Sequence, residues 1–152
     1  DGIRDGTVTG VQTCALPISI EMNSRINHLL PLREKLIKGL QKISNHYFNG
    51  HPTKRLPNNI NFCFEYVEGE AMLLNLDMEG VAVSTGSACS SANLKPSHVL
   101  LAIGRSHETA HGSIRFTLGR LTVEDDIDYV LDIFPKIVEK LRAMSPLYKR
   151  FK

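Results

Sequence analysis

Hydrophobic residues recur at helical spacing in the first regular part of the chain, which begins near Ile20. Five aliphatic side chains there fall on one face of a helix: Leu32, Leu36, Ile37, Leu40 and Ile43. Pro31 precedes them, and a proline either begins a helix or kinks a longer one. The pattern therefore predicts a helix that begins either at Pro31 or near Ile20.

The last third of the chain carries the strongest helical pattern. Seven apolar residues recur there at helical spacing: Ile127, Val130, Leu131, Phe134, Ile137, Val138 and Leu141. Thr122 is the expected N-cap, because its hydroxyl can accept a hydrogen bond from the first turn. Acidic residues fill that turn, where they complement the helix dipole, and Pro135 is a point at which the helix can kink.

Alternation of apolar and polar residues predicts strands between these two helices. Residues 60–66 alternate, residues 81–84 form a short β-branched run, and residues 113–118 are a third strand. The other predicted elements are a turn and two short helices: residues 49–52, about 70–78 and 96–104. The chain is therefore predicted to be an α+β domain in which helices cover a short, mainly antiparallel sheet.

The first nineteen residues follow neither period and are rich in glycine and threonine. Residues 8–18 (VTGVQTCALPI) resemble a translated sequencing adapter. Residues 1–19 are therefore interpreted as a non-native segment, with a natural disordered extension as the alternative. Residues 20–152 form the predicted domain, and Cys14 carries no functional weight.

Composition and charge exclude several classes of function. The 152 residues are 42% hydrophobic and 22% charged, as in ordinary soluble domains. A net charge of only +2, without a run of Lys or Arg, argues against a nucleic-acid partner. No apolar run approaches the ~18 residues that would span a membrane, and no secretory signal is recognisable. Three widely spaced cysteines form no disulfide framework, so a reducing, cytoplasmic compartment is expected.

Cys89 lies in a loop of small residues. Residues 84–91 (STGSACSS) contain no large side chain that could be buried, so folding is expected to restrain them little. A nucleophilic cysteine needs such access, and a mobile thiol suits attack at one place and delivery at another. The alternative is an ordinary small residue in a tight loop, and the spacing alone favours that alternative.

Arg115 interrupts an apolar strand, with Ile114 and Phe116 on the opposite face. A guanidinium in such a place requires a partner, because an unpaired buried charge is costly. A substrate carboxylate held by two parallel hydrogen bonds is one such partner. A structural ion pair with an internal acid is the other, and the strand pattern leaves both open.

Residues 107–111 fit the HExxH zinc-protease pattern, in which a helix places His107 and His111 on one side of a metal. Gly104 and Gly112 bracket the segment, and a strand follows at once, so the helix is too short for that role. The two histidines are therefore interpreted as part of a connection between a helix and a strand.

Five segments in this order resemble the C-terminal region of the cysteine desulfurases that serve iron–sulfur cluster assembly. The segments are NGHPTKRLP (49–57), INFCFEYVEGE (60–70), STGSACSS (84–91), PSHVLLAIG (96–104) and AHGSIRFTLGR (110–120). The resemblance runs from about Ile20 to Met144. It implies the small C-terminal domain of a fold-type I enzyme that uses pyridoxal 5'-phosphate (PLP), within the class V aminotransferase-like group.

The resemblance also implies a mechanism. In this family L-cysteine binds at PLP, and the catalytic cysteine, at the position of Cys89, attacks the substrate sulfur. Alanine leaves, and the persulfide passes to an iron–sulfur scaffold or another acceptor protein. An arginine at the position of Arg115 holds the substrate α-carboxylate. The family forms homodimers. No stable metal site is implied, although Cys89 could ligate an iron–sulfur cluster transiently on the scaffold.

The sequence departs from the family pattern in two respects. The PLP lysine of the family lies in an upstream large domain, and Lys54 is interpreted as a surface residue, so this chain alone is expected to be inactive. Ala92 and Asn93 stand where relatives usually have a glycine, which could stiffen the loop. Two alternatives remain: a sulfur-relay or scaffold-binding module, and a PLP enzyme resembling selenocysteine lyase.

Overall fold

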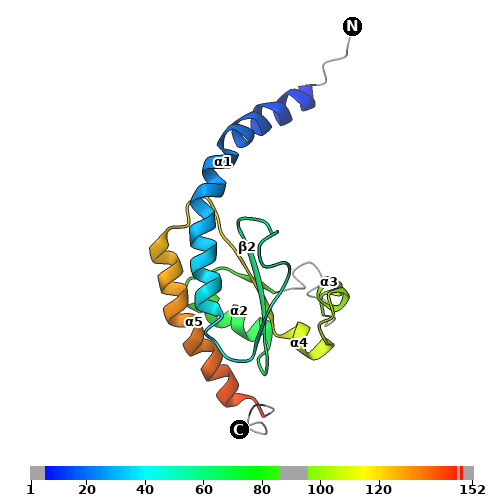
Figure 1. The fold of residues 1–152 in the computed structure, drawn as a ribbon, viewed down its shortest axis with the longest axis vertical. Helices are drawn as coiled ribbons and strands as arrows, with labels where there is room; N and C mark the ends of the chain where they lie inside the picture. The colour runs from blue at the N-terminus through cyan, green and yellow to red at the C-terminus, as the bar shows by residue number, and fades with distance from the viewer. Residues whose placement is uncertain (1–5, 86–95, 147, 149–152) are drawn as a thin grey trace.

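The computed structural model describes residues 6–85, 96–146 and 148, and describes side chains from Ser19 onward within those ranges. Five helices and four strands follow one another (Figure 1): α1 Gly6–Leu40, β1 His46–Phe48, β2 Asn59–Phe64, α2 Gly69–Met78, β3 Ser84–Thr85, α3 His98–Ala102, α4 His107–His111, β4 Ser113–Thr117 and α5 Glu124–Met144. No helix in these described ranges has the length and apolar character needed to cross a membrane.

The four strands form one antiparallel sheet in the order β1-β2-β4-β3. β2 and β4 lie at its centre, with Ile60 opposite Phe116 and Phe62 opposite Ile114. The prediction of an α+β domain with a short antiparallel sheet is therefore confirmed.

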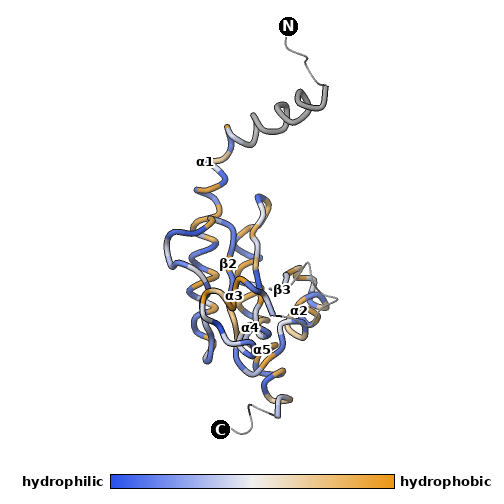
Figure 2. The backbone as a smooth tube through the Cα atoms, turned by 90° about the vertical axis from the view of Figure 1, so that its right-hand side faces the viewer, coloured by the Kyte–Doolittle hydropathy of each residue, from blue (hydrophilic) through white to orange (hydrophobic). Residues whose placement is uncertain are grey.

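Helices cover both faces of this sheet. Figure 1 shows α1 and α5 on one side of β2 and the short helices α3 and α4 on the other. The main core lies under α1, α2 and α5 and contains Phe62, Phe64 and Phe134, which are fully buried. Hydrophobic positions of α1 and α5 alternate with hydrophilic ones along the tube in Figure 2, as an amphipathic helix requires.

Helix α1 confirms the predicted hydrophobic face, because Leu36 and Leu40 are buried against the sheet and α5. It also excludes a helix start at Pro31, since the helix runs through this residue without a break, but it begins at Gly6, well before the predicted start near Ile20. The structure differs from the sequence prediction at residues 6–19, which continue α1, although no regular element was predicted there. Extending an existing helix needs no new nucleus, so weak local preference is enough. The non-native origin of residues 1–19 stays a prediction.

The start of α5 differs from the prediction by one residue. Val123, and not Thr122, is the N-cap, and its backbone N–H donates to Oδ2 of Asp126 at 2.9 Å. The hydroxyl of Thr122 instead accepts from the backbone N–H of Gly119 at 3.0 Å. Thr122 is therefore used to close the turn before the helix, and the acidic first turn caps the helix in its place.

The strands also differ from the prediction in their boundaries and number. β2 ends at Phe64, two residues early, because Tyr66 adopts a φ of 67° that leaves the extended conformation. Of the predicted run at residues 81–84, only Ser84 lies in the sheet, where it forms β3 with Thr85. The sequence did not predict β1. This strand pairs with β2, and Phe48 lies opposite Phe62.

Arg142 fixes the end of the sheet where β1 and β2 meet α5. Its buried guanidinium donates to the carbonyl oxygens of Ser44, Asn45 and Glu65 at 2.9, 3.0 and 3.1 Å. Asn45 and Tyr66 both have a positive φ, of 50° and 67°. Arg142 therefore binds the backbone at both of these turns, at the carbonyl of Asn45 itself and at that of Glu65, directly before Tyr66. These contacts hold the carbonyl oxygens of the two turns in place, and that of Asn45 also accepts from the backbone N–H of Glu65 at 3.0 Å.

Candidate functional site

Arg115, the functional side chain predicted on β4, lies on the sheet face opposite the main core. Along β2, Asn61 and Cys63 alternate with core phenylalanines, and the register places Asn61 beside Arg115 and Cys63 beside Ser113. Ser84 of β3 is the other neighbour of Arg115. Cross-strand pairing therefore produces a row of polar residues, Asn61, Arg115 and Ser84, on one face.

Arg115 is exposed on this face, whereas Ile114 and Phe116 on either side of it are buried in the core. The strand alternation that was predicted from the sequence is therefore confirmed. Among the described residues, no acid forms an ion pair with Arg115. A guanidinium without an ion-pair partner can donate two parallel hydrogen bonds to a carboxylate from outside this part of the chain.

Cys89, together with Ala92 and Asn93, lies outside the described residues. The two described ends of its segment are Thr85 and Pro96. Thr85 pairs with Ile114 in the sheet, one position from Arg115, and Pro96 leads into α3. The segment that carries Cys89 therefore begins next to Arg115 in the sheet and returns to the helices that cover the same face.

α3 and α4 cover Cys63 on this face. The thiol side chain is fully buried and packs in a small cluster with Leu100 and Ala110, one from each helix. Gly104, with a φ of 87°, ends the turn after α3, as the sequence predicted. The two short helices therefore cover the sheet next to the polar row, at Cys63.

A partly buried hydrogen-bond network, which the sequence did not predict, joins the segment between α3 and α4 to the sheet. Arg105, between α3 and α4, donates from Nε to Oδ1 of Asn49 at 2.8 Å, and from Nη2 to the carbonyl oxygen of Phe48 at 3.3 Å. Its guanidinium also lies 4.6 Å from the centre of the Tyr47 ring. Asn49 is only 4% exposed, and its amide nitrogen donates to Oδ1 of Asn61 at 2.7 Å and to Sγ of Cys63 at 3.1 Å.

The environment of Cys63 suits a structural thiol and not a nucleophile. Burial raises the pKa of the Cys63 thiol, which outweighs the hydrogen bond from Asn49 and the charge of Arg105, both of which lower it. A raised pKa reduces the thiolate fraction at neutral pH, and only the thiolate is strongly nucleophilic.

We expect Cys63 to resist alkylation in the folded protein. Iodoacetamide at pH 8, followed by peptide mass mapping, should leave Cys63 unmodified until urea unfolds the chain. Because the folded-state pKa is raised, the neutral thiol contributes stability below the usual thiol pKa, and this is lost as pH rises through the folded pKa. Rapid labelling of Cys63 without denaturant would contradict this description.

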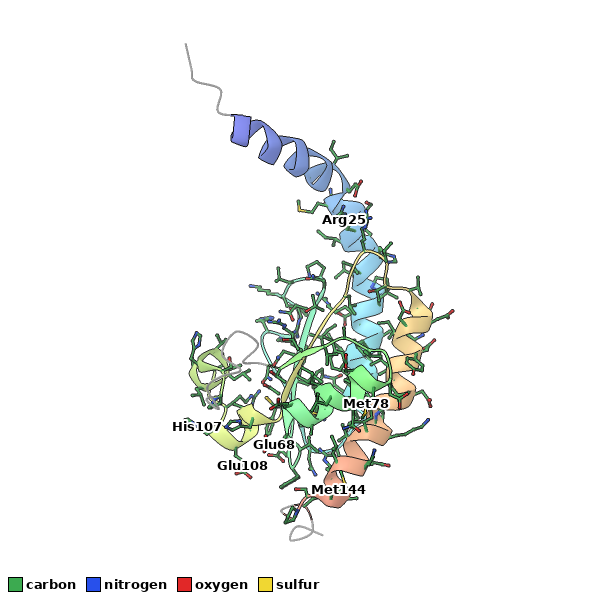
Figure 3. All side chains as sticks on the ribbon, turned by 180° about the vertical axis from the view of Figure 1, so that it is seen from behind. Arg25, Glu68, Met78, His107, Glu108 and Met144 are labelled. Carbon is green, nitrogen blue, oxygen red and sulfur yellow. The ribbon has the colours of Figure 1, made fainter. Side chains whose placement is uncertain are left out.

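Residues 107–111 form α4, a helix of five residues whose N-cap, Ser106, accepts from the backbone N–H of Thr109 at 3.1 Å. His107 and Glu108 lie at its exposed start (Figure 3). The segment is thus a connection from α3 to β4, as predicted. Within the described ranges, no group of three or more His, Cys, Asp or Glu is arranged to hold a metal ion.

The described lysines do not fit the covalent attachment of PLP, which requires an amine that can become neutral. Nζ of Lys35 lies 2.6 Å from Oδ1 of Asp128 and 2.7 Å from Oε1 of Glu124. The hydrogen bond to Asp128, and then that to Glu124, raise the pKa of Lys35 and favour its charged form. The other described lysines are exposed: Lys38, Lys42, Lys54, Lys136 and Lys140.

Comparison with known families places this chain in a class of proteins. The model of the aminotransferase class-V family matches residues 8–130. The chain belongs to that family.

Individual relatives are more specific. The chain is 56% identical to cysteine desulfurase IscS of Dictyoglomus turgidum, over 88% of this chain and 34% of the relative. It is 47% identical to cysteine desulfurase IscS 1 of Archaeoglobus fulgidus, over 98% of this chain and 40% of the relative. A solved NifS-like protein from Rickettsia africae superposes with a TM-score of 0.68 at 27% identity, over 78% of this chain and 30% of that one. The chain therefore spans about a third of the length of the relatives it matches.

Proposed function

We propose that this chain is the C-terminal part of a cysteine desulfurase, which removes sulfur from L-cysteine and leaves L-alanine. The observation that carries the proposal is Arg115, exposed on the sheet beside the strand from which the Cys89 segment starts. In a family whose relatives are cysteine desulfurases, an exposed arginine in this place supports a site for the substrate carboxylate. The rest of the protein, including the PLP lysine, is needed for turnover, so this chain alone is expected to be inactive.

Each of the two residues has a separate task. Arg115 binds the α-carboxylate of L-cysteine with two parallel hydrogen bonds, which orients the substrate sulfur toward the Cys89 segment. Cys89, as the thiolate, attacks that sulfur and forms an S–S bond. The C–S bond breaks, its electron pair stays with carbon and is protonated, and Cys89 keeps a persulfide. When bound, PLP supplies the electron sink for this cleavage.

The partners follow from the same reaction. The persulfide on Cys89 passes to a sulfur-acceptor protein, for which an iron–sulfur scaffold is proposed, with Cys89 as a transient cluster ligand there. The full-length protein is proposed to be a cytoplasmic homodimer that carries PLP in its larger domain. Sequence similarity to the desulfurases from Dictyoglomus turgidum and Archaeoglobus fulgidus supports the substrate and the cofactor.

The proposal is tested in a full-length chimera that joins residues 20–152 to the preceding part of the Dictyoglomus turgidum relative. Release of L-alanine from L-cysteine should be measurable in this protein. Arg115→Lys should raise the KM for L-cysteine about 10- to 100-fold, because lysine keeps the charge but loses the two parallel hydrogen bonds. The exposed Lys54→Met variant is the control.

Two results would contradict the proposal. One is a chimera that binds PLP, as its absorbance shows, but releases no L-alanine from L-cysteine. The other is an Arg115→Lys variant with an unchanged KM, which would remove Arg115 from the carboxylate site.

A further inference from the structure

Asn61 and Arg115 are direct neighbours across β2 and β4, on the face opposite the main core. Directly opposed residues of an antiparallel pair have Cβ atoms about 4.5–5.5 Å apart. The Asn61 side chain is therefore within reach of any small ligand that Arg115 holds. An amide N–H beside a guanidinium gives a second donor for a carboxylate.

The direction of the Asn61 amide follows from its partners. Arg105 can only donate, so Asn49 must turn Oδ1 toward it, at 2.8 Å. The amide nitrogen of Asn49 then faces Asn61 and Cys63, at 2.7 and 3.1 Å. Asn61 must accept with Oδ1, because the group facing it is a donor.

The sheet order decides where the free end of that amide lies. β2 stands between β1 and β4, and Asn49, which directly follows β1, occupies the Oδ1 side of Asn61. Nδ2 of Asn61 therefore points away from β1, toward the side on which β4 and Arg115 lie. Within the described residues, no acceptor for Nδ2 of Asn61 is found.

Several further contacts of Asn49 and Arg105 hold the Asn61 amide in this orientation. Asn49 is buried, and its backbone N–H also donates to the carbonyl oxygen of Asn61 at 3.0 Å. Arg105 is held by the Phe48 carbonyl and by the Tyr47 ring as well as by Asn49. An amide flip of Asn49 would place its NH2 group against the Arg105 guanidinium, which leaves both donors unpaired and is costly in a buried place.

We propose that Asn61 donates a second hydrogen bond to the substrate α-carboxylate held by Arg115, and that Arg105 is a positioning residue that orients Asn61 through Asn49. The inference rests on the proposed function of Arg115 and adds two residues to the same site. Its ligand class is an α-amino acid with a free carboxylate.

The test measures binding and not turnover, in the PLP-loaded chimera described above. Isothermal titration calorimetry gives the dissociation constant for L-alanine, and L-alaninamide serves as the matched probe without a carboxylate. Asn61→Val should weaken L-alanine binding about tenfold, the effect of one hydrogen bond to a charged group, and should change L-alaninamide binding less than about twofold. Asn61→Leu is the second variant, and thermal unfolding checks that both variants fold.

The positioning role of Arg105 is tested by measuring whether its substitution still affects L-alanine affinity when Asn61 is also replaced. Arg105→Met should weaken L-alanine binding about fivefold, and Arg105→Lys, which keeps a donor for Asn49, should restore most of the affinity. In the Asn61→Val background, Arg105→Met should cause no further loss, because its effect passes through Asn61. Lys54→Met, on the exposed loop between β1 and β2, is the control.

The outcomes separate this inference from the proposed function. If Arg115→Met leaves the L-alanine constant unchanged, the carboxylate role of Arg115 fails. If Arg115→Met weakens binding but both Asn61 variants bind L-alanine normally, only the role of Asn61 fails. If Arg105→Met causes an equal loss in both backgrounds, the relay is wrong, and Arg105 only supports the fold.

Discussion

Replacing Cys89 with serine should remove desulfurase activity from the full-length chimera, with a fall in kcat on the order of 1,000-fold or more. A serine hydroxyl is not ionised at neutral pH and cannot form an S–S bond with the substrate sulfur. L-Alanine release reports the loss, and mass spectrometry of the protein reports the persulfide on Cys89.

Binding of L-alanine to the same variant is the matched control. Cys89→Ser should bind L-alanine as the unchanged chimera does, because the proposed carboxylate site on β4 does not involve the thiol. A variant that still releases L-alanine at the original rate would show that Cys89 is not the nucleophile, and would favour another acceptor for the sulfur.

The second large effect is on stability, and it concerns the aromatic contacts under α5. Phe134 is fully buried, with its ring edge-on to Phe64 at 5.2 Å and to Phe116 at 5.5 Å between centroids. It thereby joins α5 to both central strands of the sheet. Phe134→Ala should lower the free energy of unfolding by about 3–5 kcal/mol, through lost burial and the cavity left behind.

Urea unfolding of the 152-residue chain, followed by far-ultraviolet circular dichroism, measures this loss. Lys140→Ala, at an exposed position of the same helix, is the control and should change the free energy of unfolding by less than about 0.5 kcal/mol. A loss below about 1 kcal/mol for Phe134→Ala would mean that α5 does not depend on this contact.

Periodic features of the fold could be predicted because burial imposes them locally. Leu36 and Leu40 on α1, and Ile127 and Phe134 on α5, are buried as their spacing predicted. The alternation around Arg115 likewise placed its side chain on the face opposite Ile114 and Phe116. Each of these depends only on the period of a helix or a strand.

Features that depend on distant partners could not be predicted in this way. Arg105 and Asn49 are 56 positions apart, and Arg142 and Ser44 are 98 apart, so no local pattern relates them. The N-cap moved from Thr122 to Val123 because Gly119 competes for the threonine hydroxyl. Asn49 was the one residue of this network that the sequence pattern had marked, as part of a turn. Once such an asparagine is buried, its whole amide needs hydrogen-bond partners.

The position of Thr85, at the end of an edge strand, limits how far the Cys89 sulfur can lie from the sheet. Cys89 follows Thr85 by four positions, and an extended chain spans at most about 3.3–3.6 Å per position. The thiol is therefore tethered within about 14 Å, plus the length of its own side chain, of the end of β3. Since β3 is an edge strand beside Arg115, the sulfur-accepting protein of the proposed reaction would have to bring its own cysteine to this edge of the domain.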